Sequence, residues 1–351
     1  MNPTQTLNTA NLPELQPGAV LMHGQYRVER FLNSGGFGMT YLARDSLNRP
    51  VVIKECFPQS MCQRFGAKVS SRSAKDVQQF KSIVRHFIRE AHRLAQLSHP
   101  NIVGVHHVFE DNETAYMALD FVQGGDLQGR LENEPEHLSP LAVVNLLTTL
   151  LDAVQFIHEN GLLHCDISPD NIILNDDGGP VLIDFGAARE HKTNTQRVLS
   201  SLAVVKEGYS PQELYLQDAD QGPYSDLYAL GATFYHLIAG EPPPNSQDRL
   251  AALATKRVDP YRSLALFENS GKYGPAFIAA IDKSLHVLPT DRFQCAQDWS
   301  DAINPTKRKT AALADAQSDD AMRSVIKKLV AETNAAQEPD PLPTTQIQRA
   351  E

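Results

Sequence analysis

Two short stretches decide the fold of this chain: His164-Cys165-Asp166-Ile167-Ser168-Pro169-Asp170-Asn171 and Asp184-Phe185-Gly186. Asp166 and Asn171 lie five residues apart, and Asp184 follows Asp166 by eighteen residues. Oxygen ligands at these positions can hold Mg²⁺ while one carboxylate stays free for chemistry. The first stretch follows a long apolar helical pattern and the second follows the apolar run 180–183. Both are therefore expected to be loops at the ends of buried elements.

A glycine-rich turn and a lysine on an apolar strand lie towards the N-terminus. The turn is Leu32-Asn33-Ser34-Gly35-Gly36-Phe37-Gly38, and Lys54 ends the run Val51-Val52-Ile53-Lys54. Glycines let backbone N–H groups approach phosphate oxygens without interference from a Cβ atom. A lysine on an apolar strand is unfavourable unless it has a partner. An ATP phosphate and a carboxylate from the following helix would supply one.

The hydrophobic pattern predicts a strand-rich segment followed by a larger helix-rich one. Strands are expected at 26–32, 39–44, 51–55, 103–110 and 114–121, and a helix at 76–97. Apolar helices are expected at 139–160 and 223–240. Residues 1–25 are polar, with two prolines and no periodicity, and are interpreted as a flexible leader. Residues 304–351 are interpreted as a weak amphipathic helix and a disordered tail, either a linker or a docking element.

Composition excludes several classes of function. The 351 residues favour two lobes or domains at roughly 100–200 residues each. The net charge of −10 argues against a nucleic-acid binder. No run is expected to reach the ~18 apolar residues of a membrane span, and no signal peptide is recognised, so a cytoplasmic location is expected. The four cysteines form no CxxC pair and are interpreted as reduced thiols.

These motifs, in this order, resemble the protein kinase family over residues 26–303. The resemblance is closest to bacterial Ser/Thr kinases, through the runs 36–43 (Gly-Phe-Gly-Met-Thr-Tyr-Leu-Ala) and 181–189 (Val-Leu-Ile-Asp-Phe-Gly-Ala-Ala-Arg). It implies an α+β, two-lobed kinase-like fold. A small antiparallel β-sheet N-lobe with one helix would span 26–121, and a larger helical C-lobe would span 122–303. ATP would bind between the lobes.

The resemblance also assigns catalytic roles. Lys54 would hold the α- and β-phosphates and pair with Glu90 of the N-lobe helix. Asp166 would be the catalytic base or would orient the substrate hydroxyl. Asn171 and Asp184 would coordinate Mg²⁺, or Mn²⁺ in its place. The distance in sequence from Lys54 to Glu90 is long for the family, so residues 57–75 are interpreted as an insertion.

The nucleotide would contact the glycine-rich turn, both walls of the cleft and the segment between the lobes: Leu32, Gly35, Gly36, Gly38, Val52, Asp120, Val122, Asp126 and Ile173. Leu32 and Val52 would lie above the adenine and Ile173 below it. The Asp120 carbonyl and the Val122 amide would bind the adenine edge, and Asp126 the ribose. Leu119 would be the gatekeeper.

Four positions depart from the family pattern. Asn33 replaces a loop glycine, and asparagine tolerates unusual backbone angles. Cys165 replaces the arginine that usually receives a phosphorylated activation loop, so control by loop phosphorylation is not expected. Ser168 replaces a lysine that reaches the γ-phosphate, and Lys206 replaces a threonine of the activation segment. Because the family fold makes these two positions neighbours, we hypothesise that Lys206 supplies the charge that Ser168 lacks; alternatively, Lys206 is a solvated loop lysine.

Further family features and alternatives follow from the resemblance. Glu213 would pair with Arg292, and Asp226 would tie down the catalytic loop. The alternatives are a pseudokinase or nucleotide-binding scaffold, and a small-molecule kinase; tyrosine specificity is not favoured. Protein Ser/Thr substrates are expected, as is autophosphorylation, after which a phosphothreonine-reading partner could bind. The candidate acceptors lie in the activation segment and the two tails: Thr4, Thr6, Thr193, Thr195, Ser200, Ser201, Thr344 and Thr345.

Overall fold

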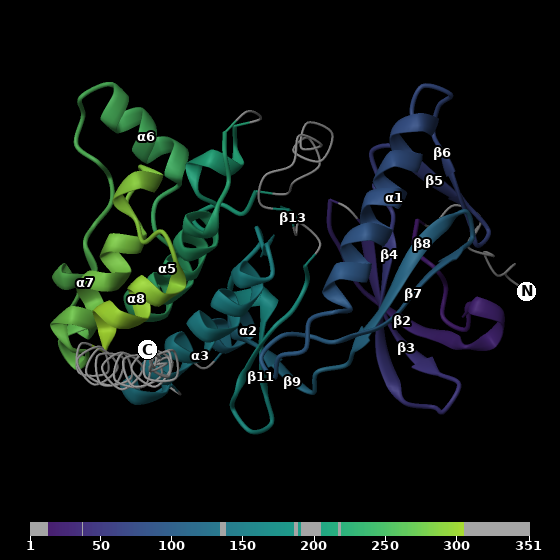
Figure 1. Ribbon diagram of the computed structural model, residues 1–351, viewed down its shortest axis with the longest axis horizontal. Coiled ribbons are helices and arrows are strands. Elements are labelled where there is room, and N and C mark those ends of the chain that lie inside the picture. Colours follow the sequence, from purple (N-terminus) through teal and green to yellow (C-terminus); the bar gives the residue numbers. More distant parts are fainter. Residues whose placement is uncertain are drawn as a thin grey trace, which may run out of the picture. The chain divides into compact units, whose positions relative to one another are not determined.

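The computed structural model describes residues 13–36, 38–133, 138–185, 189–190, 205–216 and 219–304 (Figure 1). The chain divides into two compact units, Met1–Ile303 and Asn304–Glu351. All but one residue of the second unit lies outside the described residues. The weak helix and tail expected at 304–351 therefore stay a prediction, and the fold below is that of the first unit.

An antiparallel sheet forms the N-lobe, as predicted. Its strand order is β1-β2-β3-β4-β8-β7. The strands are β1 (Val20–Leu21), β2 (Tyr26–Ser34), β3 (Gly38–Asp45), β4 (Pro50–Cys56), β7 (Val105–Asp111) and β8 (Thr114–Asp120). Side chains alternate between buried and less buried along β3, so one face packs into the core. All five strands expected from the sequence are present, and each begins and ends within two residues of the expected bounds.

The N-lobe helix α1 (Val77–Leu94) packs against β4, β7 and β8 (Figure 1). Its buried residues recur at three- and four-residue spacings and form one apolar stripe: Phe80, Ile83, Val84, Phe87, Ala91 and Leu94. Burial of this stripe fixes the helix on the sheet. Glu90 precedes the fully buried Ala91 and lies at the edge of the stripe.

Residues 13–25 correct the prediction of a flexible leader that reaches to residue 25. Leu15 is only 3% exposed, and its backbone N–H donates to the hydroxyl of Tyr41 at 3.1 Å. The Pro13 carbonyl accepts a hydrogen bond of 2.7 Å from Arg64. Residues 20–21 add strand β1 to the sheet, and a 3₁₀ helix, Met22–Gly24, follows. The buried leucines Leu15 and Leu21, together with hydrogen bonds to distant residues, thus order a segment that has no periodicity.

The insertion expected at 57–75 contains a hairpin. Its strands are β5 (Cys62–Phe65) and β6 (Lys68–Ser71), which form a separate two-stranded sheet. Cys62 and Val69 are buried, and Arg64 reaches into the lobe to bind Glu55. The hairpin is therefore part of the N-lobe core.

The C-lobe is mainly helical. Its helices are α2 (Leu127–Asn133), α3 (Pro140–Glu159), α5 (Pro223–Ala239), α6 (Ser246–Ala254), α7 (Pro275–Ser284) and α8 (Ala296–Ile303). Short 3₁₀ helices are Pro169–Asn171, Gln212–Leu214, Leu264–Leu266, Glu268–Lys272 and Pro289–Asp291. The small strands β9 (Gly124–Asp126), β11 (Ile172–Asn175) and β12 (Pro180–Leu182) pair in the order β12-β11-β9, and β10 (Leu162–Leu163) pairs with β13 (Arg189–Glu190).

Both predicted C-lobe helices are confirmed, and local capping explains their ends. The Ser139 side chain accepts from the backbone N–H of Ala142 and caps α3. Gly240, with φ of 82°, ends α5 in the left-handed conformation that favours glycine. No membrane span was expected from the sequence, but by length and composition alone α3 is long and apolar enough to cross a membrane. Its apolar residues, however, are largely buried in the C-lobe core.

Candidate active site

A cavity of about 380 Å³ lies between the two lobes. Strands β2, β3 and β4 supply one wall, the segment after β8 supplies the back, and β9, β11 and the residues around Asp184 supply the other wall. Its volume is within the range that takes a small ligand. The sequence-predicted residues among its lining are Leu32, Val52, Lys54, Leu119, Asp120, Val122, Asp126, Asn171, Ile173 and Asp184.

Some lining residues were missed in the sequence. They include Arg30, Thr40, Val103 and Ile183. Thr40 lies two residues after Gly38 on β3, and strand alternation could have placed it on the same face. Ile183 directly precedes Asp184 and could have been found with it. Val103 comes from the segment before β7 and leaves no local signal.

Lys54 lies on β4 and its side chain is only 8% exposed. Its Nζ atom forms an ion pair with Asp184 Oδ1, which provides the partner that a buried ammonium needs. Glu90 bonds His86 one turn back on α1, with His86 Nε2 to Glu90 Oε1 at 2.7 Å. The Lys54–Glu90 pair therefore stays a prediction.

The turn between β2 and β3 carries Gly35, Gly36 and Gly38. The Gly35 N–H donates to the Gly38 carbonyl at 2.9 Å and closes the turn. A Cβ atom at Gly38 would collide with the carbonyl oxygen of Glu55 on β4. Glycine is thus required at position 38 for the strands to approach. None of the three glycines is among the residues that line the cavity.

The segment between the lobes is held by Asp120. Its backbone N–H donates to the Gly104 carbonyl at 2.9 Å, and its carboxylate accepts from the Gly104 N–H at 3.1 Å. These bonds orient the residues whose backbone would meet an adenine, Asp120 and Val122. Asp126 accepts from the Gly129 N–H at 2.6 Å near the start of α2. Asp126 also lines the cavity, and its contact with the ribose stays a prediction.

Asp226 ties down the catalytic loop, as expected from the resemblance. Its carboxylate accepts from the backbone N–H groups of His164 at 2.8 Å and Cys165 at 2.7 Å. His158 donates a third hydrogen bond, also at 2.8 Å. Cys165 has φ of 60°, a conformation that costs free energy for a residue other than glycine. The hydrogen bonds to Asp226 stabilise this strained backbone and so fix the orientation of the neighbouring residue, Asp166.

Asp166 and Asn171 are joined through the Asn171 amide. Asn171 Nδ2 donates to the Asp166 carbonyl at 2.7 Å and to its carboxylate at 3.0 Å. Burial raises the pKa of Asp166 to about 6, although the ammonium of Lys206 lowers it. Asp166 is therefore ionised at neutral pH and more basic than an ordinary carboxylate.

Lys206 lies beside the catalytic loop. Its Nζ atom is 2.7 Å from Ser168 Oγ, 2.8 Å from Asp170 Oδ2 and 3.4 Å from Asp166 Oδ1. Ser168 in turn donates to Asp170 at 2.6 Å. The neighbourhood of positions 168 and 206 predicted from the sequence is thus present. The Lys206 ammonium thus lies beside Ser168, the position at which the family usually carries a lysine.

The residues expected to hold a metal fit a hard cation. Asn171 uses its Nδ2 atom towards Asp166, so the amide oxygen is the atom left for a cation. Asp184 adds a carboxylate from the same wall of the cavity, because the Ile183 N–H donates to the Asn171 carbonyl at 2.9 Å. No cluster of three His, Cys, Asp or Glu side chains able to hold a metal occurs within the described ranges. This sparse oxygen set suits Mg²⁺, which usually keeps water and binds substrate phosphates.

The end of the activation segment is anchored as expected. Arg292 donates to the two carboxylate oxygens of Glu213 at 2.7 and 3.1 Å, and Ser225 donates to Glu213 at 2.8 Å. All three side chains are buried. The predicted acceptors Thr193, Thr195, Ser200 and Ser201 lie outside the described residues, as do those in the two tails.

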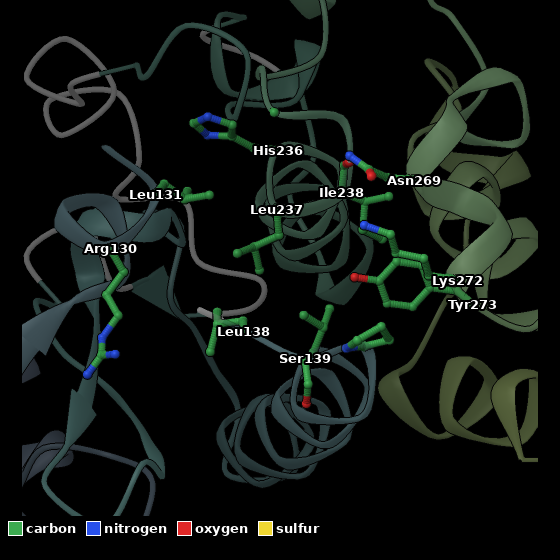
Figure 2. A pocket seen from close by; sticks show the side chains of 13 residues that line it. Arg130, Leu131, Leu138, Ser139, His236, Leu237, Ile238, Asn269, Lys272 and Tyr273 are labelled. Carbon is green, nitrogen blue, oxygen red and sulfur yellow. The ribbon is translucent and has the colours of Figure 1, made fainter. Parts of the chain in front are cut away.

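A second cavity, of about 580 Å³, lies within the C-lobe between α2, α3 and the end of α5 (Figure 2). Figure 2 shows Arg130 and Lys272 on opposite sides of a lining that includes Leu131, Leu138 and Leu237. It is larger than the cavity between the lobes but contains none of the predicted catalytic residues. We therefore place the candidate active site in the smaller cavity.

The fold and the site together define a protein kinase domain. The family model described as "Protein kinase domain" matches residues 26–301, and the chain belongs to the protein kinase family. The family and fold expected from the sequence are thereby confirmed.

Three similar proteins illustrate the relationship. The chain is 32% identical over 295 residues to Serine/threonine-protein kinase PknA of Nostoc sp. (strain PCC 7120 / SAG 25.82 / UTEX 2576), covering 81% of this chain and 47% of the relative. It is 28% identical over 302 residues to Serine/threonine-protein kinase PrkC of Bacillus subtilis (strain 168), covering 83% and 41%. A solved structure described as "PpkA-294 apo form" has a TM-score of 0.69 and 32% identity, covering 83% of this chain and 100% of that chain. The chain spans about half the length of the curated relatives it matches.

Proposed function

We propose that this chain is an active Ser/Thr protein kinase that transfers the γ-phosphate of ATP to protein hydroxyls. The observation that carries the proposal is the contact of Lys206 Nζ with Ser168, Asp170 and Asp166. The missing lysine at position 168 is the main argument for a pseudokinase. An ammonium supplied by the activation segment removes that argument.

The chemistry requires positioning and charge neutralisation more than covalent catalysis. Asp166 accepts or orients the proton of the incoming hydroxyl, and its raised pKa of about 6 makes it a better acceptor while it stays ionised at neutral pH. Lys206 lies close enough to Asp166 to hold it and to reach a phosphate that approaches it.

ATP supplies the phosphoryl group, and Mg²⁺ or Mn²⁺ neutralises the charge of its phosphates. Asn171 and Asp184 would hold the metal through oxygen atoms. Lys54 would then leave Asp184, bind the phosphates and pair with Glu90. Leu32, Val52 and Ile173 would enclose the adenine, because all three line the cavity between the lobes.

The acceptor hydroxyls are those of Ser or Thr in protein substrates and in the chain itself. Ser168 and Asp170 occupy the positions where tyrosine kinases usually carry an arginine. Once phosphorylated, a threonine-containing tail such as 344–347 would provide a docking site for a phosphothreonine-reading partner. Mass spectrometry after prolonged incubation with Mg²⁺ and ATP tests this; tails that stay unphosphorylated would contradict it.

Phosphate incorporation tests the proposal directly. The protein and Asp166→Asn are incubated with γ-labelled ATP and Mg²⁺, and the labelled amino acids are then identified. We expect label on Ser or Thr, and a rate lower by a factor of about 10² or more in the variant. Nucleotide binding without any transfer would instead favour the alternative, a pseudokinase or nucleotide-binding scaffold.

A further inference from the structure

We infer that His86 is a positioning residue that holds Glu90 in a resting arrangement and competes with Lys54 for it. The inference rests on the proposed function, in which Glu90 pairs with Lys54 during phosphate transfer. Nothing in the family pattern or in the sequence motifs singles out His86.

The His86–Glu90 contact is well formed and largely excluded from water. The two residues are one turn apart on α1, and His86 Nε2 lies 2.7 Å from Glu90 Oε1. Their side chains are only 18% and 14% exposed. A hydrogen bond to a carboxylate is stronger in such surroundings than at a solvated surface, so it can restrain the Glu90 side chain.

Lys54 is occupied at the same time by a different carboxylate. It pairs with Asp184, which lies on the C-lobe side of the cavity. Because α1 packs on β4, Glu90 and Lys54 lie on adjoining elements, and Glu90 is directed inward rather than into solvent. In the resting structure His86 thus contacts Glu90 while Lys54 contacts Asp184. Phosphate transfer would require Glu90 and Asp184 to change partners.

The histidine is incompletely satisfied in the resting pair. His86 Nδ1 is buried and has no hydrogen-bond partner in the described part of the chain. A buried polar atom without a partner raises the free energy of its conformation. The His86–Glu90 pair is thus a restraint that binding energy can overcome. When a metal engages Asp184, Lys54 loses its partner, and Glu90 becomes the carboxylate that can replace it.

Removal of the histidine should therefore remove this restraint on Glu90. We compare His86→Leu, which removes the donor, with His86→Gln, which keeps an N–H donor at the same spacing. His92→Leu is the matched control, because His92 is exposed on the same helix. Folding is checked by thermal unfolding, and His86→Ala replaces the leucine variant if that variant does not fold.

Two readouts are used on the full chain. A water-soluble carbodiimide couples an amine to a carboxylate that it contacts, and peptide mass mapping identifies whether Lys54 is joined to Glu90 or to Asp184. Initial rates at varied ATP concentration give kcat and KM separately. We expect His86→Leu to increase Lys54–Glu90 coupling severalfold, to raise kcat about three- to tenfold and to lower KM for ATP. His86→Gln and His92→Leu should match the parent protein.

The outcomes separate this inference from the proposed function. Unchanged Lys54–Glu90 coupling in a folded His86→Leu protein overturns the role of His86, whatever the rate. A lower rate in His86→Leu than in His92→Leu, with unchanged coupling, would assign His86 a purely structural role. If coupling increases but no variant transfers phosphate, the competition for Glu90 stands and the proposed kinase activity fails.

Discussion

In the N-lobe the central buried carboxylate is Glu55, and in the C-lobe it is Asp226. Glu55 accepts hydrogen bonds from three side chains, with Tyr41 at 2.9 Å, Tyr116 at 2.7 Å and Arg64 at 2.5 Å. Asp226 accepts from two backbone N–H groups and from His158. Both carboxylates are at most 1% exposed. They are equally buried, but they hold different parts of the molecule.

The two carboxylates differ in their partners: Glu55 accepts hydrogen bonds from side chains, whereas Asp226 accepts mainly from backbone N–H groups. Through Arg64, Glu55 connects the β5–β6 hairpin and the segment at Pro13 to the sheet. Burial, together with the charge of Glu55, raises the pKa of Tyr116 well above its usual range, so its hydroxyl stays a donor. Asp226 instead fixes the strained turn that carries Asp166. We conclude that Glu55 mainly stabilises the N-lobe, whereas Asp226 both stabilises the C-lobe and positions catalysis.

Asp226→Ala should have the largest effect of the changes considered. Burial alone would raise the pKa of Asp226, but the hydrogen bonds from His158 and from the backbone N–H of His164 hold it below its usual range, so the native group is a carboxylate. Its removal leaves two buried N–H groups unpaired, each costing about 1–3 kcal/mol. We expect a loss of about 3–5 kcal/mol in urea unfolding and a fall of about 10² in transfer rate.

The control is Asp220→Ala, which removes an exposed carboxylate a few residues earlier. Both the unfolding free energy and the transfer rate of this variant should match the parent protein. An Asp226→Ala protein that is destabilised but transfers phosphate normally would contradict the distinction between Glu55 and Asp226.

Arg64→Met should destabilise the fold by about 3–5 kcal/mol, because it leaves a buried carboxylate without its cation. The transfer rate per folded molecule should change by less than about threefold, since no backbone of the catalytic loop is involved. Urea unfolding and initial rates measure the two effects separately. Adding Glu55→Gln to Arg64→Met should recover most of the stability, because the amide keeps an acceptor for the tyrosines. A rate loss as large as that of Asp226→Ala would show that the Arg64–Glu55 pair also positions the catalytic residues.

The stability of the fold should also depend on pH through His164, whose backbone N–H donates to Asp226. Burial lowers the pKa of His164 to about 4, below the ordinary value of about 6.5. The unfolded chain therefore takes up a proton between pH 6.5 and 4 that the folded chain does not. Stability is fully present above about pH 6.5 and is lost as the pH falls, by up to about 3 kcal/mol. Urea unfolding of His164→Gln should show a smaller loss over this range; an equal loss would contradict the assignment.

The sequence predicts the role of one of the two buried carboxylates, Asp226, but not that of the other, Glu55. The resemblance to protein kinases was sufficient to predict the role of Asp226. Glu55 was missed because it follows Lys54 on the same strand, and its partner Arg64 comes from an insertion with no family pattern. The segment 13–25 was missed for a similar reason: the burial of Leu15 depends on Tyr41, a contact that no local periodicity encodes.

Within the site, positions set by local motifs could be predicted, and contacts between elements could not. Alternation along β4 and the family register were sufficient to place Lys54 and Val52 at the cavity. The pairing of Lys54 with Asp184 depends on how the two lobes are arranged. His86 and Glu90, in contrast, lie four residues apart on one helix, a spacing that the sequence alone could have indicated. Val103 lines the cavity only because its segment approaches Leu182 from the other lobe.

The central claim is that Lys206 replaces the lysine missing at Ser168, and a rescue experiment tests it most directly. Single-turnover transfer from γ-labelled ATP is measured at saturating ATP for the parent protein, Lys206→Ala, and Lys206→Ala combined with Ser168→Lys. We expect Lys206→Ala to lower the rate by about 10², the size typical for loss of one charge-stabilising donor. The added lysine should restore the rate to within about tenfold of the parent protein. An unchanged rate in Lys206→Ala would contradict the claim.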